Sequence, residues 1–504
     1  MESSPPPTTT TTHIALVSVP AFSHQVSILE FAKRLLHLHT DTFHVTCIIP
    51  TLSSSSSKHS FFFDSLPRNI HCIFLPSVNF QDLNNNGASV EIQTQLSASR
   101  AMSSVRETLV SLSRTTAITA LIADAMAPEA LELGKELNIL SYIYFPCSTM
   151  VLSICFHSRN LDHEVSCEYK DHPGLIPLPG CISISGRDLP DSMQDRGSLA
   201  YKLFLQRCQR YLDAHDGILV NSFMELEEET TKAISEHEHG NGNEHGNGAG
   251  NGNGGDYPPV YLVGPITQSG SRSRCECLLW LDKQQPDSVL YVSFGSGGTL
   301  SQEQINELAL GLELSKHKFL WVNLRAPNDR ASATYFSDGG LVDDDDDPLQ
   351  FLPKGFLERT KEQGLVMCGW APQVEVLGHR SIGAFLSHCG WNSVLESVVH
   401  GVPMIAWPLF AEQRSNAALV SEGLKVALRA KMKNPRGKSN GVVVKEEIVE
   451  LIKGVMEEGL EGEEIRRKVK ELKKLANCAM MEDGSSTRTI EKLVNKWKRL
   501  GKSL

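Results

Sequence analysis

Short apolar runs alternate with amphipathic stretches along the first half of the chain. The apolar runs have strand length and lie at residues 13–19, 45–49, 70–75, 117–123, 142–145 and 217–221. Between them, residues 90–112 and 199–214 have a helical pattern, and after the first run one helical face carries Val26, Leu29, Ala32, Leu35 and Leu36. Strands that alternate with helices in this way predict a parallel sheet covered by helices.

The same alternation begins again in the second half. Apolar runs of strand length lie at residues 289–294, 319–323, 366–368, 382–386 and 402–407. We expect one helix to begin near Ser301, where Gln304 completes the spacing of a capping box, and another to cover residues 392–400. From Lys445 onward the chain is charged and helical, and residues 487–500 form a last amphipathic helix. We therefore predict an α/β protein with two doubly wound, Rossmann-like domains.

The boundary between the two domains is expected near residue 265. Residues 237–256 are a low-complexity run of Gly, Asn and His that cannot bury a core, so a disordered insertion is favoured over a weak metal site on its histidines. The Pro- and Gly-rich residues 172–186 are expected to be a loop, and residues 257–265 to cross toward the second half. The predicted parts are a disordered N-terminus at 1–12, domains at 13–265 and 266–480, and a C-terminal helix within 481–504.

Composition narrows the classes of function. The net charge of −11 argues against nucleic acid or an anionic membrane surface as a partner. No apolar run approaches the roughly 18 residues of a membrane helix, and residues 1–12 lack the apolar stretch of a signal peptide. The 12 cysteines have neither disulfide-scaffold nor metal-ligand spacing. We expect reduced thiols, a cytoplasmic monomer, no metal site, and a solvated loop at the acidic residues 343–347.

His24 and Asp124 follow two of the predicted strands. The carboxyl ends of parallel strands meet at one edge of a sheet, where ligands bind, so the two side chains are expected to lie close together. The start of the following helix disfavours an imidazolium at His24, which would leave a neutral ring able to accept a proton. A carboxylate behind the ring would hold its tautomer. The alternatives are a capping or packing role for His24 and a helix N-cap for Asp124, and the two roles of Asp124 are compatible.

A strand–loop–helix–strand unit covers residues 382–407. Its loop, residues 387–393, contains Gly390, which permits close backbone approach. The N-terminus of the next helix favours an anion, and His388 can add a hydrogen bond. A second glycine-rich turn, residues 295–299, joins a strand to a helix in the same half. Together the two loops predict a phosphate-binding site.

A longer stretch around this unit carries a family resemblance. From Trp370 to Gln413 the sequence reads WAPQVEVLGHRSIGAFLSHCGWNSVLESVVHGVPMIAWPLFAEQ. It resembles the signature box of plant family 1 glycosyltransferases, which transfer sugars from UDP-sugars to small molecules. Residues 30–35, 165–169, 293–298 and 423–429 resemble the hydroquinone glucosyltransferase branch. The resemblance implies two domains facing across a cleft (the GT-B type), with acceptor on the first, UDP-sugar on the second, and the C-terminal helix returning to the first.

The resemblance also implies roles for individual residues. His24 matches the general base and Asp124 its partner, and Glu91 and Phe145 are candidate acceptor contacts. The residues that match the UDP-sugar site are Trp370, Ala371 and Gln373 at the uracil, Glu396 at the ribose, Ser296, His388, Asn392 and Ser393 at the diphosphate, and Trp391, Glu412 and Gln413 at the sugar. Gln at the last position is associated with glucose, whereas galactose-using members tend to carry His. No metal or cofactor is implied.

The turn that carries His24 departs from the family pattern. Ala21, Ser23 and Ser27 stand where Gly, Gly and Pro are typical. The main hypothesis is inverting O-glucosylation of a small phenolic acceptor by UDP-glucose, with hydroquinone-like phenols, monolignols, flavonoids and chlorinated phenols or anilines all open as acceptors. The altered turn motivates an alternative, a catalytically weak small-molecule binder that keeps the fold. A dinucleotide oxidoreductase is disfavoured, because no G-x-G-x-x-G motif with a downstream acidic residue follows an early strand.

Overall fold

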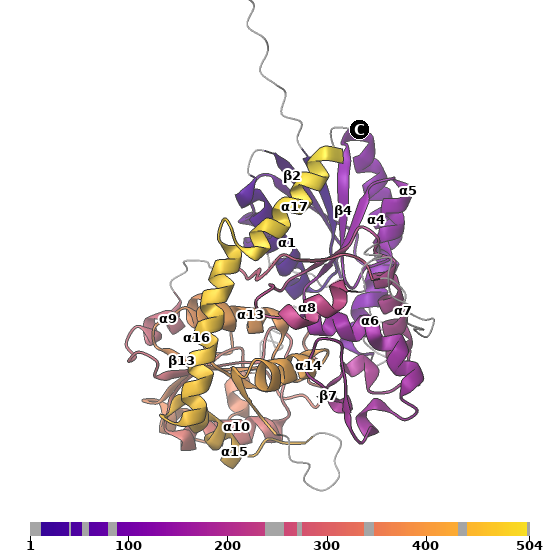
Figure 1. The fold of residues 1–504 in the computed structure, drawn as a ribbon. Coiled ribbons are helices and arrows are strands. Elements are labelled where there is room, and N and C mark those ends of the chain that lie inside the picture. The colour runs from indigo at the N-terminus through magenta and orange to yellow at the C-terminus, as the bar shows by residue number, and fades with distance from the viewer. Residues whose placement is uncertain are drawn as a thin grey trace, which may run out of the picture.

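The chain folds into two parallel sheets with helices around them (Figure 1). The computed structural model describes residues 12–39, 42–52, 60–78, 88–236, 257–269, 275–336, 347–431 and 441–500. The predicted insertion at 237–256, residues 1–11 of the N-terminus and residues 343–346 of the acidic run lie outside the described residues. Expectations about these segments therefore stay predictions.

The first sheet has the strand order β3-β2-β1-β4-β5-β8-β9, and all neighbouring pairs are parallel. Its strands are β1 Thr12–Val17, β2 Phe43–Ile49, β3 Ile70–Phe74, β4 Ile118–Asp124, β5 Leu140–Phe145, β8 Ile218–Val220 and β9 Val260–Leu262. Its helices are α1 Phe22–Leu38, α2 Ser60–Asp64, α4 Val90–Thr115, α5 Ala130–Glu136, α6 Thr149–Glu164, α7 Leu199–Leu212 and α8 Glu228–Ser235. In β1, Ile14 packs with side chains of α1 and Ala15 with those of α4, because successive side chains of a strand point to opposite faces.

The second sheet has the order β12-β11-β10-β13-β14-β15, again with parallel neighbours. Its strands are β10 Val289–Ser293, β11 Lys318–Trp321, β12 Gly364–Val366, β13 Ile382–Ser387, β14 Met404–Ala406 and β15 Ala427–Arg429. The helices of this half are α9 Glu276–Leu281, α10 Gln302–Ser315, α11 Phe356–Thr360, α12 Gln373–Leu377, α13 Trp391–His400, α14 Gln413–Ala418, α15 Lys445–Met456 and α16 Leu460–Met480. The predicted doubly wound α/β architecture is confirmed in both halves.

Each sheet contains one point where the order of its strands reverses. It lies between β1 and β4 in the first sheet and between β10 and β13 in the second. In open α/β sheets, ligands bind outside the carboxyl ends of the strands at this switch point. The loops after β1, β4, β10 and β13 are therefore the segments in which the fold favours a binding site.

Several short elements differ from the sequence prediction. Residues 260–262 form β9 at the edge of the first sheet, so the predicted crossing there is wrong in part. Strand β12 begins at Gly364, two residues before the predicted start, and β15 was not predicted at all. The predicted loop at 172–186 contains an antiparallel pair, β6 Leu175–Ile176 and β7 Ile184–Ser185. All these strands have three residues or fewer, so the apolar pattern that marks a strand is weak in them.

The capping box predicted at the start of α10 is half right. The Ser301 hydroxyl accepts a hydrogen bond from the Gln304 N–H (3.2 Å), as an N-cap should. The Gln304 side chain does not reach back to Ser301. Its Nε2 donates to the Val443 carbonyl (3.0 Å) and its Oε1 accepts from the Val443 N–H (2.9 Å). Gln304 therefore secures a segment that lies far along the chain.

The last two helices connect the halves. In Figure 1, α16 runs along the second half and α17, Ser485–Leu500, lies along the first. Trp497 of α17 is fully buried and packs edge-on against Phe43 of β2 and Tyr142 of β5. No helix among the described residues is long and apolar enough to cross a membrane.

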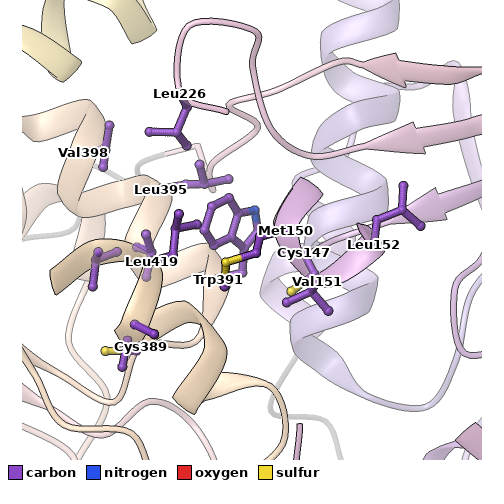
Figure 2. Close-up of a cluster of buried hydrophobic side chains, with 14 of the residues drawn as sticks. Cys147, Met150, Val151, Leu152, Leu226, Cys389, Trp391, Leu395, Val398 and Leu419 are labelled. Carbon is purple, nitrogen blue, oxygen red and sulfur yellow. The ribbon is translucent and has the colours of Figure 1, made fainter. Parts of the chain in front are cut away.

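A second connection is a hydrophobic cluster where the two halves meet (Figure 2). Trp391, at the start of α13, lies among Cys147 and Met150 from the first half and Leu395 and Leu419 from the second. Its ring is 2% exposed, and its Nε1 donates to the Asn221 carbonyl of the first half (2.7 Å). This packing holds the two switch points close to each other.

Candidate active site

One cavity lies between the two switch points. It has a volume of about 310 Å³ and is lined from both halves of the chain. All residues predicted for the site except Asp124 line this cavity. The predicted residues that line it are His24, Glu91, Phe145, Ser296, Trp370, Ala371, Gln373, His388, Trp391, Asn392, Ser393, Glu396, Glu412 and Gln413. Residues separated by up to 389 positions therefore share one cleft, as the resemblance implied.

His24 and Asp124 form a buried pair at the first switch point. His24 lies in the first turn of α1, the helix that follows β1 after a short loop, and Asp124 is the last residue of the adjacent β4. The His24 Nδ1 lies 2.9 Å from Oδ2 and 3.0 Å from Oδ1 of Asp124. Asp124 is fully buried, whereas the His24 side chain is 24% exposed. With Nδ1 directed at the carboxylate, Nε2 is the ring nitrogen left to accept a proton from a ligand.

Opposing effects act on the pKa of His24. Burial lowers the pKa of His24, but attraction to Asp124 and the hydrogen bond between them raise it, and the net shift is upward. From the helix start alone the sequence predicted a neutral ring; the partner carboxylate stabilises the protonated ring, and the net shift of the His24 pKa is upward. A base with a raised pKa is a stronger proton acceptor but needs a higher pH to be free.

Asp124 is not the N-cap of a regular helix. Its Oδ1 accepts the Met126 N–H (2.8 Å), which closes a turn, but α5 begins only at Ala130, with Glu129 as its N-cap residue. The carboxylate thus accepts hydrogen bonds from both the turn and the imidazole. The alternative of a helix N-cap is therefore wrong, and the turn contact instead fixes the orientation of the carboxylate.

Two loops of the second half meet at His388. Ideal Cβ atoms placed on Gly295 and on Gly390 would each lie 2.5 Å from its Nε2, so both positions must be glycine for the ring to fit. Gly295 also has a φ of +74°, which other residues rarely adopt. Burial lowers the pKa of His388 to about 4, and its Nδ1 is buried without a hydrogen-bond partner in the described structure. A neutral ring with an unused nitrogen, beside the start of α13, suits an anionic ligand.

A polar group of three side chains lies beside these loops. Gln373 Nε2 donates to Ser393 Oγ (2.9 Å) and to Glu396 Oε2 (2.6 Å). Burial raises the pKa of Glu396 to about 7. Ala371 is buried, whereas Trp370 is 61% exposed despite its large indole ring. An exposed aromatic face beside buried polar groups can stack a planar base and bind its sugar.

Glu412 and Gln413 lie at the beginning of α14. Gln413 is 4% exposed, and its Oε1 accepts the N–H groups of Leu409 (2.9 Å) and Phe410 (3.0 Å), which fixes the loop before the helix. Burial raises the pKa of Glu412. Trp391 lines the same region, but its indole N–H is used by Asn221. The sugar contact predicted for Trp391 therefore cannot come from its indole N–H.

The part of the cavity that Phe145 and Glu91 line is mostly apolar and contains two ionisable side chains, Glu91 and Arg207. Phe145 is 4% exposed, and Glu91, in the first turn of α4, has a buried Oε1 without a hydrogen-bond partner in the described structure. Arg207 of α7 is 7% exposed and donates to Gln95 Oε1 (2.7 Å). Such a pocket suits a flat aromatic molecule with a polar substituent.

Sequence reasoning missed Arg207 and Tyr335, which also line the cavity. Arg207 lies in the middle of α7, where it looks like any charged helix residue. Tyr335 lies within the long polar segment that follows β11 and has no motif around it. Neither position carries a local signal, because tertiary packing alone brings them to the cleft. Among the described residues no group of three or more His, Cys, Asp or Glu side chains could hold a metal ion.

Comparison with known proteins gives a consistent result. Residues 272–442 match the family model of UDP-glucoronosyl and UDP-glucosyl transferases. The chain is 45% identical to hydroquinone glucosyltransferase of Rauvolfia serpentina, over 96% of this chain and 97% of the relative. It is 43% identical to UDP-glycosyltransferase 72B1 of Arabidopsis thaliana, over 98% and 97% of the two chains.

Solved structures show the same similarity in three dimensions. Phytolacca americana UGT2 complexed with UDP-2fluoro-glucose and pterostilbene has a TM-score of 0.83 and 39% identity, over 97% of this chain and 100% of that one. A UDP-glucosyltransferase from Polygonum tinctorium capable of glucosylating indoxyl, in complex with 3,4-dichloroaniline, has a TM-score of 0.84 and 41% identity, over 97% and 99%.

Proposed function

The chain belongs to the family of UDP-glucoronosyl and UDP-glucosyl transferases and is a UDP-glycosyltransferase, and from that membership we propose that it transfers glucose from UDP-glucose to the hydroxyl of a small phenol with inversion. One observation carries the proposal. The His24–Asp124 pair of the first half opens into the same cavity as the two glycine-containing loops and His388 of the second half.

Each part of the cavity has a role in this reaction. Trp370 stacks on uracil, Ala371 and Gln373 lie beside it, and Glu396 binds the ribose. The diphosphate is bound by His388, by Ser296 and by the start of α13 at Asn392 and Ser393. The Gln413 amide Nε2, whose partner Oε1 is occupied by the loop, and the Glu412 carboxylate bind the sugar hydroxyls.

His24 supplies the base. Its Nε2 removes the phenol proton while the phenol oxygen attacks the anomeric carbon from the side opposite the diphosphate. The bond from that carbon to the diphosphate oxygen breaks, and UDP leaves with the bonding electrons. Asp124 stabilises the imidazolium that forms. Backbone N–H groups of the loops and the neutral His388 ring stabilise the charge on UDP, so the chemistry requires no metal.

An aromatic acceptor is supported by the apolar cavity wall and by the relatives. Pterostilbene and 3,4-dichloroaniline are the aryl ligands named for two similar structures, and hydroquinone is named for the R. serpentina relative. Phe145, Glu91 and Arg207 line the part of the cavity proposed to bind the acceptor. An attacking phenol hydroxyl carries a proton that His24 can accept, which favours O-glucosylation.

The alternative of a catalytically weak binder is not favoured. The replacements in the turn around His24 have not displaced the base, since its Nδ1 remains within 3.0 Å of both Asp124 oxygens. The Ser27 hydroxyl has a buried partner in the Tyr144 hydroxyl (2.9 Å). The altered turn is thus accommodated by new hydrogen bonds.

The test is a product assay with UDP-glucose and a panel of simple phenols and matched anilines. We expect release of UDP together with a phenyl β-glucoside, identified by mass and by the coupling constant of its anomeric proton. Absence of UDP release with every phenol, under conditions in which UDP binds, would identify a binder instead. Glucosylated anilines without glucosylated phenols would reject the proposed acceptor class.

A further inference from the structure

Residues 326–336, which follow β11, form a segment that we call the bridging segment. Four hydrogen bonds attach it to the glycine-rich turn of the second half and the residues just after it. Thr299 donates through its N–H to the Ala331 carbonyl (2.8 Å) and through its hydroxyl to the Arg330 carbonyl (2.7 Å). The Asn328 N–H donates to the Leu300 carbonyl (2.9 Å), and the Thr334 hydroxyl to the Gly297 carbonyl (3.3 Å). The bridging segment therefore moves with the proposed diphosphate-binding turn.

Tyr335 of this segment packs closely against Gly297 of the turn. An ideal Cβ on Gly297 would lie 2.6 Å from its Cδ2 and 2.8 Å from its Cα, so only glycine lets the tyrosine pack there. The ring also lies edge-on to Phe410, with centroids 5.9 Å apart, in the loop before the sugar-binding residues. Tyr335 thus contacts two loops of the proposed donor site.

The other side of Tyr335 faces the first half of the chain. Its hydroxyl lies 3.1 Å from the Ser23 hydroxyl, in the residue just before His24. Tyr335 and Phe336 pack against the core cluster that contains Ala21, and the Arg330 guanidinium donates to the Ala88 carbonyl. The bridging segment is therefore anchored in both halves.

Ser23 is held by the second half at two points. Its hydroxyl meets Tyr335, and its carbonyl accepts the Asn392 Nδ2 (3.2 Å). Position 23 is one of the places where the family pattern has Gly, which has no hydroxyl to offer. Burial raises the pKa of Tyr335 to about 12, so at neutral pH its hydroxyl keeps its proton and can donate.

We propose that Tyr335 is a positioning residue that couples the diphosphate-binding turn to the turn carrying the catalytic base, through the Ser23 hydroxyl. A bound diphosphate orders the turn at residues 295–298 and with it the bridging segment. The Tyr335–Ser23 hydrogen bond then holds the backbone next to His24 more firmly, so that Nε2 stays directed at the acceptor. The expected effect on kcat rests on the proposed function. The coupling between the two turns does not depend on it.

The kinetic test is a double-mutant cycle of Tyr335→Phe and Ser23→Ala. Each change removes one hydroxyl and leaves the ring or the β-carbon in place. Because one neutral hydrogen bond is lost, we expect each variant to lower kcat by ~2- to 10-fold with little change in KM for UDP-glucose. The double variant should lose no more than the worse single one, because both remove the same interaction. Losses that multiply, or unchanged kcat in Tyr335→Phe, would overturn the proposal.

Tyr201→Phe is the matched control. It also removes a buried tyrosine hydroxyl, which donates to Asp162 Oδ1 (2.6 Å), but Tyr201 does not line the cavity. We expect its kcat and KM to equal those of the wild type. If kcat falls as much in this control as in Tyr335→Phe, the loss of any buried hydroxyl lowers kcat. The cycle would then give no evidence for a specific role of Tyr335.

A second readout needs no turnover. We expect UDP to slow amide hydrogen exchange in a peptide spanning residues 18–26 of the wild type, although UDP binds to the other half. Tyr335→Phe should bind UDP with the same affinity by calorimetry but lose at least half of this protection. Equal protection in the two proteins would overturn the coupling. A wild type that shows UDP protection but no glucoside would reject the proposed function and leave the coupling intact.

Discussion

In the proposed mechanism, the chemistry of the cleft depends on one imidazole whose two nitrogens have different tasks. His24 Nδ1 is held by Asp124, and Nε2 is available to the acceptor. The proximity of His24 and Asp124 could be predicted from sequence, because both residues lie at the carboxyl ends of strands in one sheet. The direction of the pKa shift could not, because it depends on whether burial or the carboxylate dominates, and that balance needs the distance between them.

The pH dependence of Asp124→Asn tests this pair. In the wild type the pKa of His24 is raised, so kcat/KM should fall with decreasing pH through a midpoint above that of an ordinary histidine. Asparagine removes the attraction that raises the pKa while burial still lowers it, so the acidic limb should move to lower pH. The plateau should fall by about 10² to 10⁴, because the ring loses its fixed tautomer. The pH profiles of both proteins, measured at saturating UDP-glucose, check this. An acidic limb that stays at the same pH or moves to higher pH in Asp124→Asn would contradict it.

Trp370 allows a test of the nucleotide site that leaves the core intact. The indole is 61% exposed, so Trp370→Ala should not change the midpoint of thermal unfolding. The loss of one base–aromatic stack of about 1–3 kcal/mol should weaken UDP binding by about 5- to 150-fold. Calorimetric titration with UDP measures the affinity. Unchanged affinity would exclude Trp370 as the stacking residue.

Site residues that lie close together in the sequence could be predicted, whereas isolated ones could not. Those between Trp370 and Gln413 could be found because they lie in one continuous stretch with a recognisable pattern. Tyr335 and Arg207 could not, because each is an isolated side chain that only folding brings to the cavity. Ser23 was noticed as a departure from the family pattern, but its partner lies 312 positions away and carries no signal.

Among the elements, long apolar strands were predictable and short edge strands were not. Strand β4 is buried over all seven of its residues and is largely apolar, whereas β9 and β15 have three residues each. The start of α10 shows a different limit. Ser301 caps the helix as its position predicts, but Gln304 binds the backbone of Val443, 139 positions away. A local motif does not reveal that a backbone segment far along the chain can hydrogen-bond the same side chain.

Replacing Gln304 with Glu distinguishes the two roles of this side chain. In a capping box Glu serves as well as Gln. Here the Gln304 Nε2 donates to the buried Val443 carbonyl, and Glu would place a carboxylate oxygen against it. We expect Gln304→Glu to cost about 1–3 kcal/mol of stability, against about 1 kcal/mol for Ser301→Ala. Thermal unfolding of both variants measures the difference, and a Gln304→Glu protein as stable as the wild type would favour the capping box.

At the scale of the whole molecule, the cleft exists because the two halves are held in contact around it. Trp391 packs in the cluster at their junction, and α16 and α17 connect the second half to the first. The doubly wound halves could be predicted from the alternation of strands and helices. Their junction could not, because apolar residues such as Met150 look the same in sequence whether they face their own sheet or the other half.

Trp391→Ala should therefore destabilise the protein, in contrast to Trp370→Ala. Removing a ring that is 2% exposed leaves a cavity and an unpaired Asn221 carbonyl. We expect a loss of about 3–5 kcal/mol, seen as a lower midpoint of thermal unfolding. If this variant unfolds at the wild-type temperature, the cluster does not stabilise the junction of the halves.

The central claim is that a base from the first half faces a nucleotide-sugar pocket in the second. The most direct test is His24→Ala, with turnover and UDP affinity measured on the same preparation. We predict that kcat with UDP-glucose and a phenol falls by about 10² to 10⁴, while calorimetric affinity for UDP stays at the wild-type value. Near-normal turnover in His24→Ala would contradict the account.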